Sequence, residues 1–98
     1  MHTMYLHQLK FEWDEKKATA NFRKHGVNFK EASSVFYDEN ARLINDPDHS
    51  DDEDRFILFG LSSTLRLVVV CHCYRNKESV IRIISARKAT ANERKSYY

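Results

Sequence analysis

The sequence predicts an α+β domain in which two helices pack on a curved antiparallel sheet. The chain has 98 residues, of which 42% are hydrophobic and 12% aromatic, and it contains only two glycines and one proline. This composition is typical of a folded domain rather than a disordered tail. Two helix-start signals occur early in the chain, and four apolar strand-like segments follow them. The predicted order of elements is β-α-α-β-β-β-β-α.

The first strand and the first helix are expected next to each other. A short strand is predicted at Leu9–Trp13. Asp14 then suits an N-cap, because its carboxylate can accept hydrogen bonds from the first free amides of a helix. Gly26 suits the C-terminal stop, where a left-handed residue is favoured. These two signals predict a helix over residues 15–25.

Capping boxes predict the other two helices. Asn28, with Glu31 three residues later, resembles such a box and starts a helix expected over residues 29–37. Thr90 and Glu93 form a T-x-x-E box that starts a short basic helix at the C-terminus.

Four strands are expected to form an antiparallel meander, because polar, turn-like segments connect them. They are predicted at residues 41–44, 55–61, 65–74 and 80–87. The absence of repeats and of Pro/Gly/Ser-rich linkers predicts one domain over residues 1–98. The sequence leaves open whether residues 1–8 are ordered or form a flexible N-terminal extension.

Composition also restricts where the chain acts. No apolar run approaches the roughly 18 residues needed to span a membrane, and no signal-peptide pattern is seen, so a cytoplasmic protein is expected. Cys71 and Cys73 would lie on one face of a strand roughly 6.5–7 Å apart, which does not suit a disulfide. No second cysteine pair could complete a zinc site. Reduced cysteines, no metal and no cofactor are therefore expected.

Charge is segregated along the chain although the net charge is only +2. Residues 46–54 hold six carboxylates and no Lys or Arg, whereas residues 75–98 hold seven basic residues against two acidic ones. One region can therefore attract a polyanion while the whole chain remains close to neutral.

The acidic segment does not match a calcium-binding loop. In an EF-hand alignment Asp51 stands where glycine is required, and Ile57 stands where a bidentate glutamate is required. Two interpretations remain open: a solvated acidic turn between two strands, or a segment that holds His49 over the sheet for a functional role.

The histidines and strand arginines also allow two interpretations. His25 at a helix C-terminus is favoured there by the helix dipole, or it takes part in chemistry. His72 in an apolar strand fits a core histidine better than a catalyst. Arg82 in another apolar strand must face solvent, pair with a carboxylate or bind an anion. Arg75 and Arg87 lie at strand ends where guanidinium groups suit phosphate.

The sequence contains no P-loop, dinucleotide fingerprint, nucleophile elbow or zinc spacing. The chain is therefore expected either to catalyse a reaction without a metal ion or to have no catalytic activity. RNA cleavage fits the first case, because the 2′-hydroxyl of the substrate is the nucleophile and the protein need only position the backbone, move protons and stabilise charge.

Several motifs, in order, resemble a known family. The segments are "FEWDEKKATANFRKHGVNFKEASSVFYD", "DPDHSDDEDRF", "GLSSTLRLVVV" and "IRIISARKATANERKSYY". From about Phe11 to Tyr98 they resemble the BrnT toxins of bacterial type II toxin-antitoxin systems. The resemblance implies a small ribonuclease with a RelE-like fold. It also implies a neighbouring BrnA antitoxin with a ribbon-helix-helix domain that binds operator DNA, and a toxin-antitoxin heterotetramer that represses its own operon.

The resemblance also matches the family motifs to individual residues of this chain, but it does not say which of them take part in catalysis. The matching residues are Lys24-His25-Gly26, His49-Ser50, Arg55, Arg75, Ser85-Ala86-Arg87, Glu93-Arg94 and Tyr97.

The mechanistic hypothesis assigns the phosphate and the transition-state charge to Arg87 and Arg75. His49 is the first candidate for proton transfer and His25 is the second. The residues expected to bind RNA are Lys24, Arg55, Arg82, Lys88, Arg94 and Tyr97.

Two other functions stay open. The chain is alternatively a non-catalytic nucleic-acid-binding or regulatory subunit, or a degenerate toxin kept for complex assembly. Cleavage by the purified chain distinguishes an enzyme from both.

Overall fold

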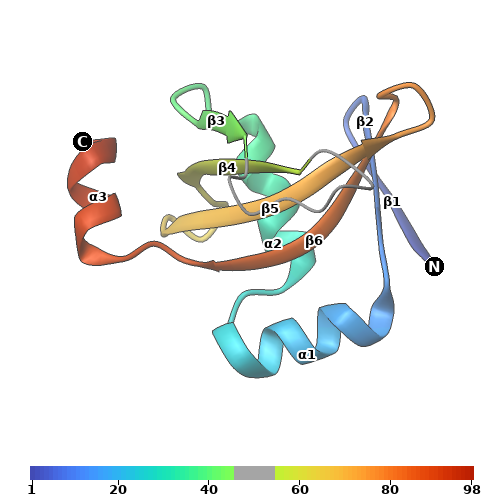
Figure 1. Cartoon of the computed structure of the whole chain (residues 1–98), viewed down its shortest axis with the longest axis horizontal. Coiled ribbons are helices and arrows are strands. Elements are labelled where there is room, and N and C mark those ends of the chain that lie inside the picture. Colours follow the sequence, from blue (N-terminus) through green and yellow to red (C-terminus); the bar gives the residue numbers. More distant parts are fainter. Residues whose placement is uncertain (46–54) are drawn as a thin grey trace.

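The computed structural model describes residues 1–45 and 55–98 and shows a sheet with helices on it (Figure 1). Within these residues six strands pair in the order β1-β2-β6-β5-β4-β3. The strands are β1 His2–Leu6, β2 Leu9–Trp13, β3 Arg42–Asn45, β4 Phe56–Leu61, β5 Leu67–Arg75 and β6 Val80–Lys88. The helices are α1 Glu15–His25, α2 Phe29–Ser34, the 3₁₀ turn η1 Val35–Tyr37 and α3 Ala91–Tyr97.

The α+β prediction is confirmed, but the predicted order and pairing need two corrections. His2–Leu6 is a strand, antiparallel to β2, where no element was expected. β2 also pairs with β6 in parallel, so the sheet is not wholly antiparallel. The meander of β3, β4, β5 and β6 is antiparallel as predicted.

Helix α1 has the predicted bounds because both of its caps form. The Asp14 carboxylate accepts hydrogen bonds from the amides of Lys16 (2.8 Å) and Lys17 (3.3 Å). Gly26 adopts the left-handed conformation at φ 71° and closes the helix. Helix α3 begins with the complete Thr90–Glu93 capping box.

Helix α2 is shorter than predicted and its cap is only half of a capping box. The Asn28 side chain accepts from the amide of Glu31 at 2.7 Å. The Glu31 carboxylate does not return to Asn28, because it binds Arg66 instead. The α-helix ends at Ser34, and η1 continues the segment to Tyr37.

The main core lies between one face of the sheet and helices α1 and α2. The residues from the helices and their connection include Val27, Phe29 and Ala32, and those from the sheet include Phe11 and Ile83. Each of these side chains is at most 2% exposed. Two helices on one face are therefore confirmed.

A buried asparagine joins α1 to β6. The side-chain amide of Asn21 donates to the carbonyls of Val27 (3.0 Å) and Ala86 (2.8 Å), and its oxygen accepts from the amide of Ala86 at 3.1 Å. Because Ala86 precedes Arg87, this contact fixes the C-terminal end of α1 against the end of β6.

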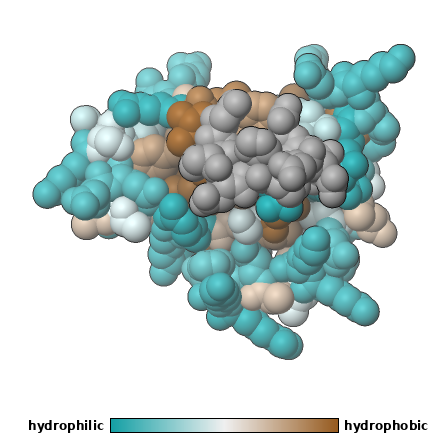
Figure 2. Space-filling view, in the orientation of Figure 1, coloured by the Kyte–Doolittle hydropathy of each residue, from teal (hydrophilic) through white to brown (hydrophobic). Residues whose placement is uncertain are grey.

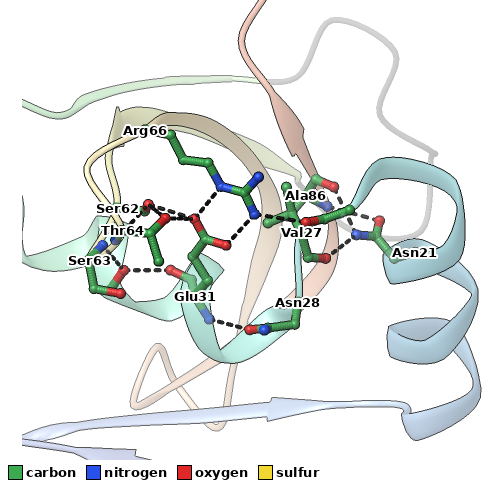
Figure 3. Close-up of polar contacts among 11 residues, drawn as sticks. Asn21, Val27, Asn28, Glu31, Ser62, Ser63, Thr64, Arg66 and Ala86 are labelled. Carbon is green, nitrogen blue, oxygen red and sulfur yellow. Dashed lines mark hydrogen bonds and ion pairs between the residues drawn. The ribbon is translucent and has the colours of Figure 1, made fainter.

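A buried carboxylate joins α2 to the β4–β5 turn (Figure 3). Glu31 is only 7% exposed. Its Oε2 accepts from Ser62 (2.7 Å), Thr64 (2.6 Å) and Arg66 Nε (2.7 Å), while Oε1 accepts from Arg66 Nη2 at 2.6 Å. Arg66 Nη2 also donates to the carbonyl of Gly26 at 2.7 Å. One ion pair thus connects α2, the β4–β5 turn and the end of α1.

Replacement of Gly60 by alanine is expected to destabilise the fold. A Cβ atom there would lie 2.9 Å from Ala41 Cβ, 2.9 Å from Asp38 Oδ2 and 3.0 Å from Val35 Cγ1. Overpacking of this kind costs about 1–3 kcal/mol, whereas Gly→Ala at a compatible site stabilises. Urea unfolding of Gly60→Ala measures the change. Unfolding free energy equal to or above that of the wild type would contradict the packing described.

Stability is expected to fall in acid because of Glu31. Hydrogen bonds from Arg66 chiefly lower the Glu31 pKa from 4.5 to about 2. The folded pKa lies below the unfolded one, so the stabilisation is full above about pH 4.5 and is lost as pH falls towards 2. The loss is roughly 2–3 kcal/mol, and it is absent in Glu31→Gln. Urea unfolding at pH 3 and pH 7 measures it, and an equal acid loss in wild type and Glu31→Gln would refute the assignment.

Candidate functional site

Arg87 at the end of β6 is bound by Glu93 from helix α3. Arg87 Nη1 lies 2.8 Å from Glu93 Oε1, and Nη2 lies 3.0 Å from Oε2. The two parallel contacts form the bidentate geometry that a guanidinium makes with carboxylate or phosphate. The same carboxylate accepts from the amide of Thr90 at 2.8 Å, so the helix cap holds Glu93 in place.

Both members of this pair are ionised at neutral pH. The hydrogen bonds from Arg87 chiefly lower the Glu93 pKa from 4.5 to about 2. The same contacts raise the pKa of Arg87. Arg87 is therefore a charged guanidinium group whose two outer nitrogens are occupied by an internal carboxylate.

Tyr97, one helical turn after Glu93, attaches α3 to the body. Its hydroxyl donates to Asp38 Oδ2 at 2.6 Å, and its ring contacts Phe59 with centroids 5.7 Å apart. Burial alone would raise the Asp38 pKa, but hydrogen bonds from the amide of Leu61 and from Tyr97 lower it overall. The hydrogen bond to Asp38 raises the Tyr97 pKa.

Helix α3 has no buried residue. Side-chain contacts through Glu93 and Tyr97 therefore hold it against the sheet, and Figure 1 shows α3 projecting from the end of β6.

Four more predicted site residues lie at this end of the sheet. The contacts of Asn21 and Gly26 place the end of α1 there, with Lys24 exposed and His25 half-buried. Lys88 and Arg94 are exposed and line a small hollow together with Arg66. In the view of Figure 2 the surface over α1 and α3 is mainly hydrophilic.

Arg75 lies at the other end of the β5–β6 hairpin. Arg75 pairs with Val80, whereas Arg87 pairs with Val69. Val80 and Arg87 are seven positions apart along β6, which corresponds to roughly 23 Å of strand. The hypothesis that Arg75 and Arg87 grip the same phosphate is wrong, because each lies at a different end of one long hairpin. Arg55, just before β4, lies towards the Arg75 end, since Phe56 pairs with His72.

Arg82 pairs with a carboxylate of the neighbouring strand. Its Nη2 lies 2.5 Å from Glu12 Oε2, and its Nε donates to the same oxygen at 2.6 Å. The parallel β2–β6 register brings the two residues together. Of the three alternatives left open for Arg82, the structure shows pairing with a carboxylate, that of Glu12.

The histidines divide into three cases. His72 is fully buried, and burial lowers its pKa to about 4, so it is neutral at pH 7 and forms part of the core. His25 lies at the Arg87 end. His49 lies outside the described residues.

Sequence reasoning missed Arg66 as a member of the site. It precedes β5 in a turn, and Glu31, its partner, was interpreted only as a capping residue. In β5, Cys71 is half-buried and Cys73 is buried.

Residues 1–45 and 55–98 contain no group of three or more His, Cys, Asp or Glu placed to hold a metal ion. They also contain no helix long and apolar enough to cross a membrane.

The arrangement can bind an anion and stabilise developing negative charge. The Arg87 guanidinium, three further cations (Lys24, Lys88 and Arg94) and a histidine lie at one end of the sheet. These groups suit recognition of a phosphodiester and the movement of a proton.

Comparison with known proteins agrees with this chemistry. The family model described as "Ribonuclease toxin, BrnT, of type II toxin-antitoxin system" matches residues 13–93. The crystal structure of the Brucella abortus ribonuclease toxin BrnT shares the fold with a TM-score of 0.63 and 24% sequence identity, covering 82% of this chain and 95% of that one. No curated protein sequence matches the chain significantly. Since the family model spans most of the chain, including both Arg87 and Glu93, this protein belongs to the BrnT family of ribonuclease toxins of type II toxin-antitoxin systems.

Proposed function

We propose that the chain is an endoribonuclease that cleaves RNA without a metal ion and binds the scissile phosphate through Arg87. The observation that carries this proposal is the bidentate Arg87–Glu93 contact. A phosphate presents two oxygens to the guanidinium fork as the Glu93 carboxylate does. In the RNA complex the phosphate replaces this carboxylate at Arg87.

The reaction uses the 2′-hydroxyl of the substrate as the nucleophile. Its oxygen bonds to the adjacent phosphorus while the bond from phosphorus to the 5′-oxygen breaks. A base takes the proton of the 2′-hydroxyl and an acid gives a proton to the leaving 5′-oxygen, so the products are a 2′,3′-cyclic phosphate and a 5′-hydroxyl. Arg87 stabilises the charge that grows on the phosphate oxygens.

Among the described residues the proposed group for proton transfer is His25, which lies at the Arg87 end of the sheet, on the helix side to which Ala86 points. Lys24, next to His25, is proposed to position the RNA backbone. Arg55, Arg75 and Arg82 are not part of this site: the first two lie towards the other end of the sheet and Arg82 pairs with Glu12.

The partner is proposed to be a BrnA-type ribbon-helix-helix antitoxin. A protein that covers the cationic end of β6 also blocks RNA, so inhibition by occlusion follows from the position of the site. The complex is proposed to be a cytoplasmic heterotetramer that binds operator DNA through the antitoxin.

Replacement of Arg87 by alanine is expected to lower the rate of RNA cleavage by about 10²- to 10³-fold, because one transition-state donor is lost. The rate is measured with purified chain and single-stranded RNA in the presence of a chelator. Arg87→Lys keeps the charge but not the fork, and an intermediate rate is expected.

Lys16→Ala is the charge control, since Lys16 is an exposed cation at the start of α1, away from the Arg87 end of the sheet. It loses the same charge and should cleave at the wild-type rate. If folded Arg87→Ala cleaves like the wild type, Arg87 has no catalytic role. Salt-sensitive RNA binding without cleavage by the wild type would instead indicate a non-catalytic binding subunit.

Replacement of Glu93 by glutamine is expected to tighten RNA binding. Glutamine preserves the capping box but removes the charge that competes with phosphate at Arg87. The pair is partly exposed, so the gain is about 1.5- to 5-fold in affinity. Titration with an uncleavable 2′-O-methyl RNA measures it. Weaker binding by Glu93→Gln would argue against competition between Glu93 and phosphate.

A further inference from the structure

We infer that the hollow beside α3 is a second RNA subsite, which binds a backbone phosphate and stacks a base next to the nucleotide held at Arg87. This inference rests on the proposed function, since it assigns a further part of the same RNA strand. The hollow measures about 170 Å³ and is lined by Leu65, Arg66, Lys88, Arg94 and Tyr98 among others.

The side-chain charge of the hollow favours an anionic ligand. Arg66, Lys88 and Arg94 face it, and none of the described residues that line it has a side-chain carboxylate. Arg66 is held by Glu31 from the protein side, so this cation is fixed rather than mobile. Lys88 and Arg94 add positive charge to the hollow, and the Glu31 carboxylate, which pairs with Arg66, does not neutralise it. The larger hollows of about 420 and 410 Å³ are lined in part by Glu15 and Asp38 respectively and lack such a set of cations.

Helix α3 connects the hollow to the Arg87 pair. Glu93 and Tyr97 are four residues apart and face the body of the protein. Arg94 and Tyr98 are also four residues apart, on the adjacent face of the helix, and line the hollow. Consecutive strand residues point to opposite faces, so Lys88 points away from Arg87. The hollow and the Arg87–Glu93 pair therefore lie at the same end of the sheet but on different sides of β6.

This separation favours a nucleic-acid strand over an isolated phosphate. A single phosphate can occupy Arg87 or the hollow, whereas a strand with successive phosphates can contact both. Tyr98 is 85% exposed and Leu65 is 79% exposed, so an unstacked base can lie against them. Stacking on an aromatic ring is typical of single-stranded RNA recognition.

The test measures binding of a single-stranded 2′-O-methyl RNA, which cannot be cleaved, as a function of salt. A double variant, Lys88→Gln with Arg94→Gln, removes two exposed cations and leaves Arg66 and its ion pair intact. The matched control is Lys16→Gln with Lys17→Gln, which removes two exposed cations from the start of α1.

The Lys88/Arg94 variant should bind on the order of tenfold more weakly, and its slope of log affinity against log salt should be smaller by about 1.4, or about 0.7 for each lost phosphate contact. The Lys16/Lys17 variant should keep the wild-type slope. Tyr98→Ala should lose on the order of tenfold in affinity, while Tyr98→Phe should bind like the wild type.

Three outcomes overturn the subsite: no RNA binding by the wild type, equal slopes in the two double variants, or unchanged binding by Tyr98→Ala. A poly-aspartate peptide serves as a second probe. If Lys88/Arg94 substitution weakens only the binding of poly-aspartate, the hollow takes an acidic peptide and the RNA assignment is wrong.

Cleavage is followed separately on ordinary RNA, so the two proposals fail in different ways. RNA binding that depends on the hollow, without cleavage, supports the subsite and refutes the ribonuclease mechanism. Cleavage that depends on Arg87, with no effect of the Lys88/Arg94 variant on binding, does the reverse.

Discussion

The buried Glu31–Arg66 ion pair is the contact on which the arrangement of the site depends. A carboxylate that is 7% exposed needs donors for both oxygens, and Ser62, Thr64 and Arg66 provide them. Because Arg66 also donates to Gly26, the pair determines where α1 ends relative to the β4–β5 turn. Removing Arg66 would leave the Glu31 carboxylate buried without its charge partner, so the site and the fold share this interaction.

The second ion pair has a different role because it is half-exposed. Arg87 and Glu93 side chains are 41% and 35% exposed, so their attraction is weak enough for another anion to compete. The fold thus uses a pair with a buried carboxylate to fix the scaffold and a more exposed pair at the proposed RNA site. Both pairs join an arginine to a glutamate, but the Glu31 side chain is 6% exposed and the Glu93 side chain is 35% exposed.

Local signals predicted the helices well, while contacts between distant residues were beyond the sequence. Asp14 and Gly26 gave both ends of α1, since a cap acts within a few residues. β1 was missed because "HTMYL" has no cap or turn signal of its own and is a strand only through pairing with β2. The Arg82–Glu12 pair depends on a parallel register between strands 70 residues apart. Arg75 and Arg87 were wrongly placed together because strand ends alone do not show which end of a hairpin each occupies.

In the mechanism that we propose, the position of α3 constrains how RNA reaches Arg87. If the whole helix moved away, Glu93 would release Arg87, but Arg94 and Tyr98 would leave the hollow at the same time. Rotation of the Glu93 side chain frees Arg87 and keeps the hollow intact. The contacts of Tyr97 with Asp38 and Phe59 favour this second route, because they hold the helix independently of Glu93. Exchange of one carboxylate for one phosphate is therefore the smallest change that opens the site.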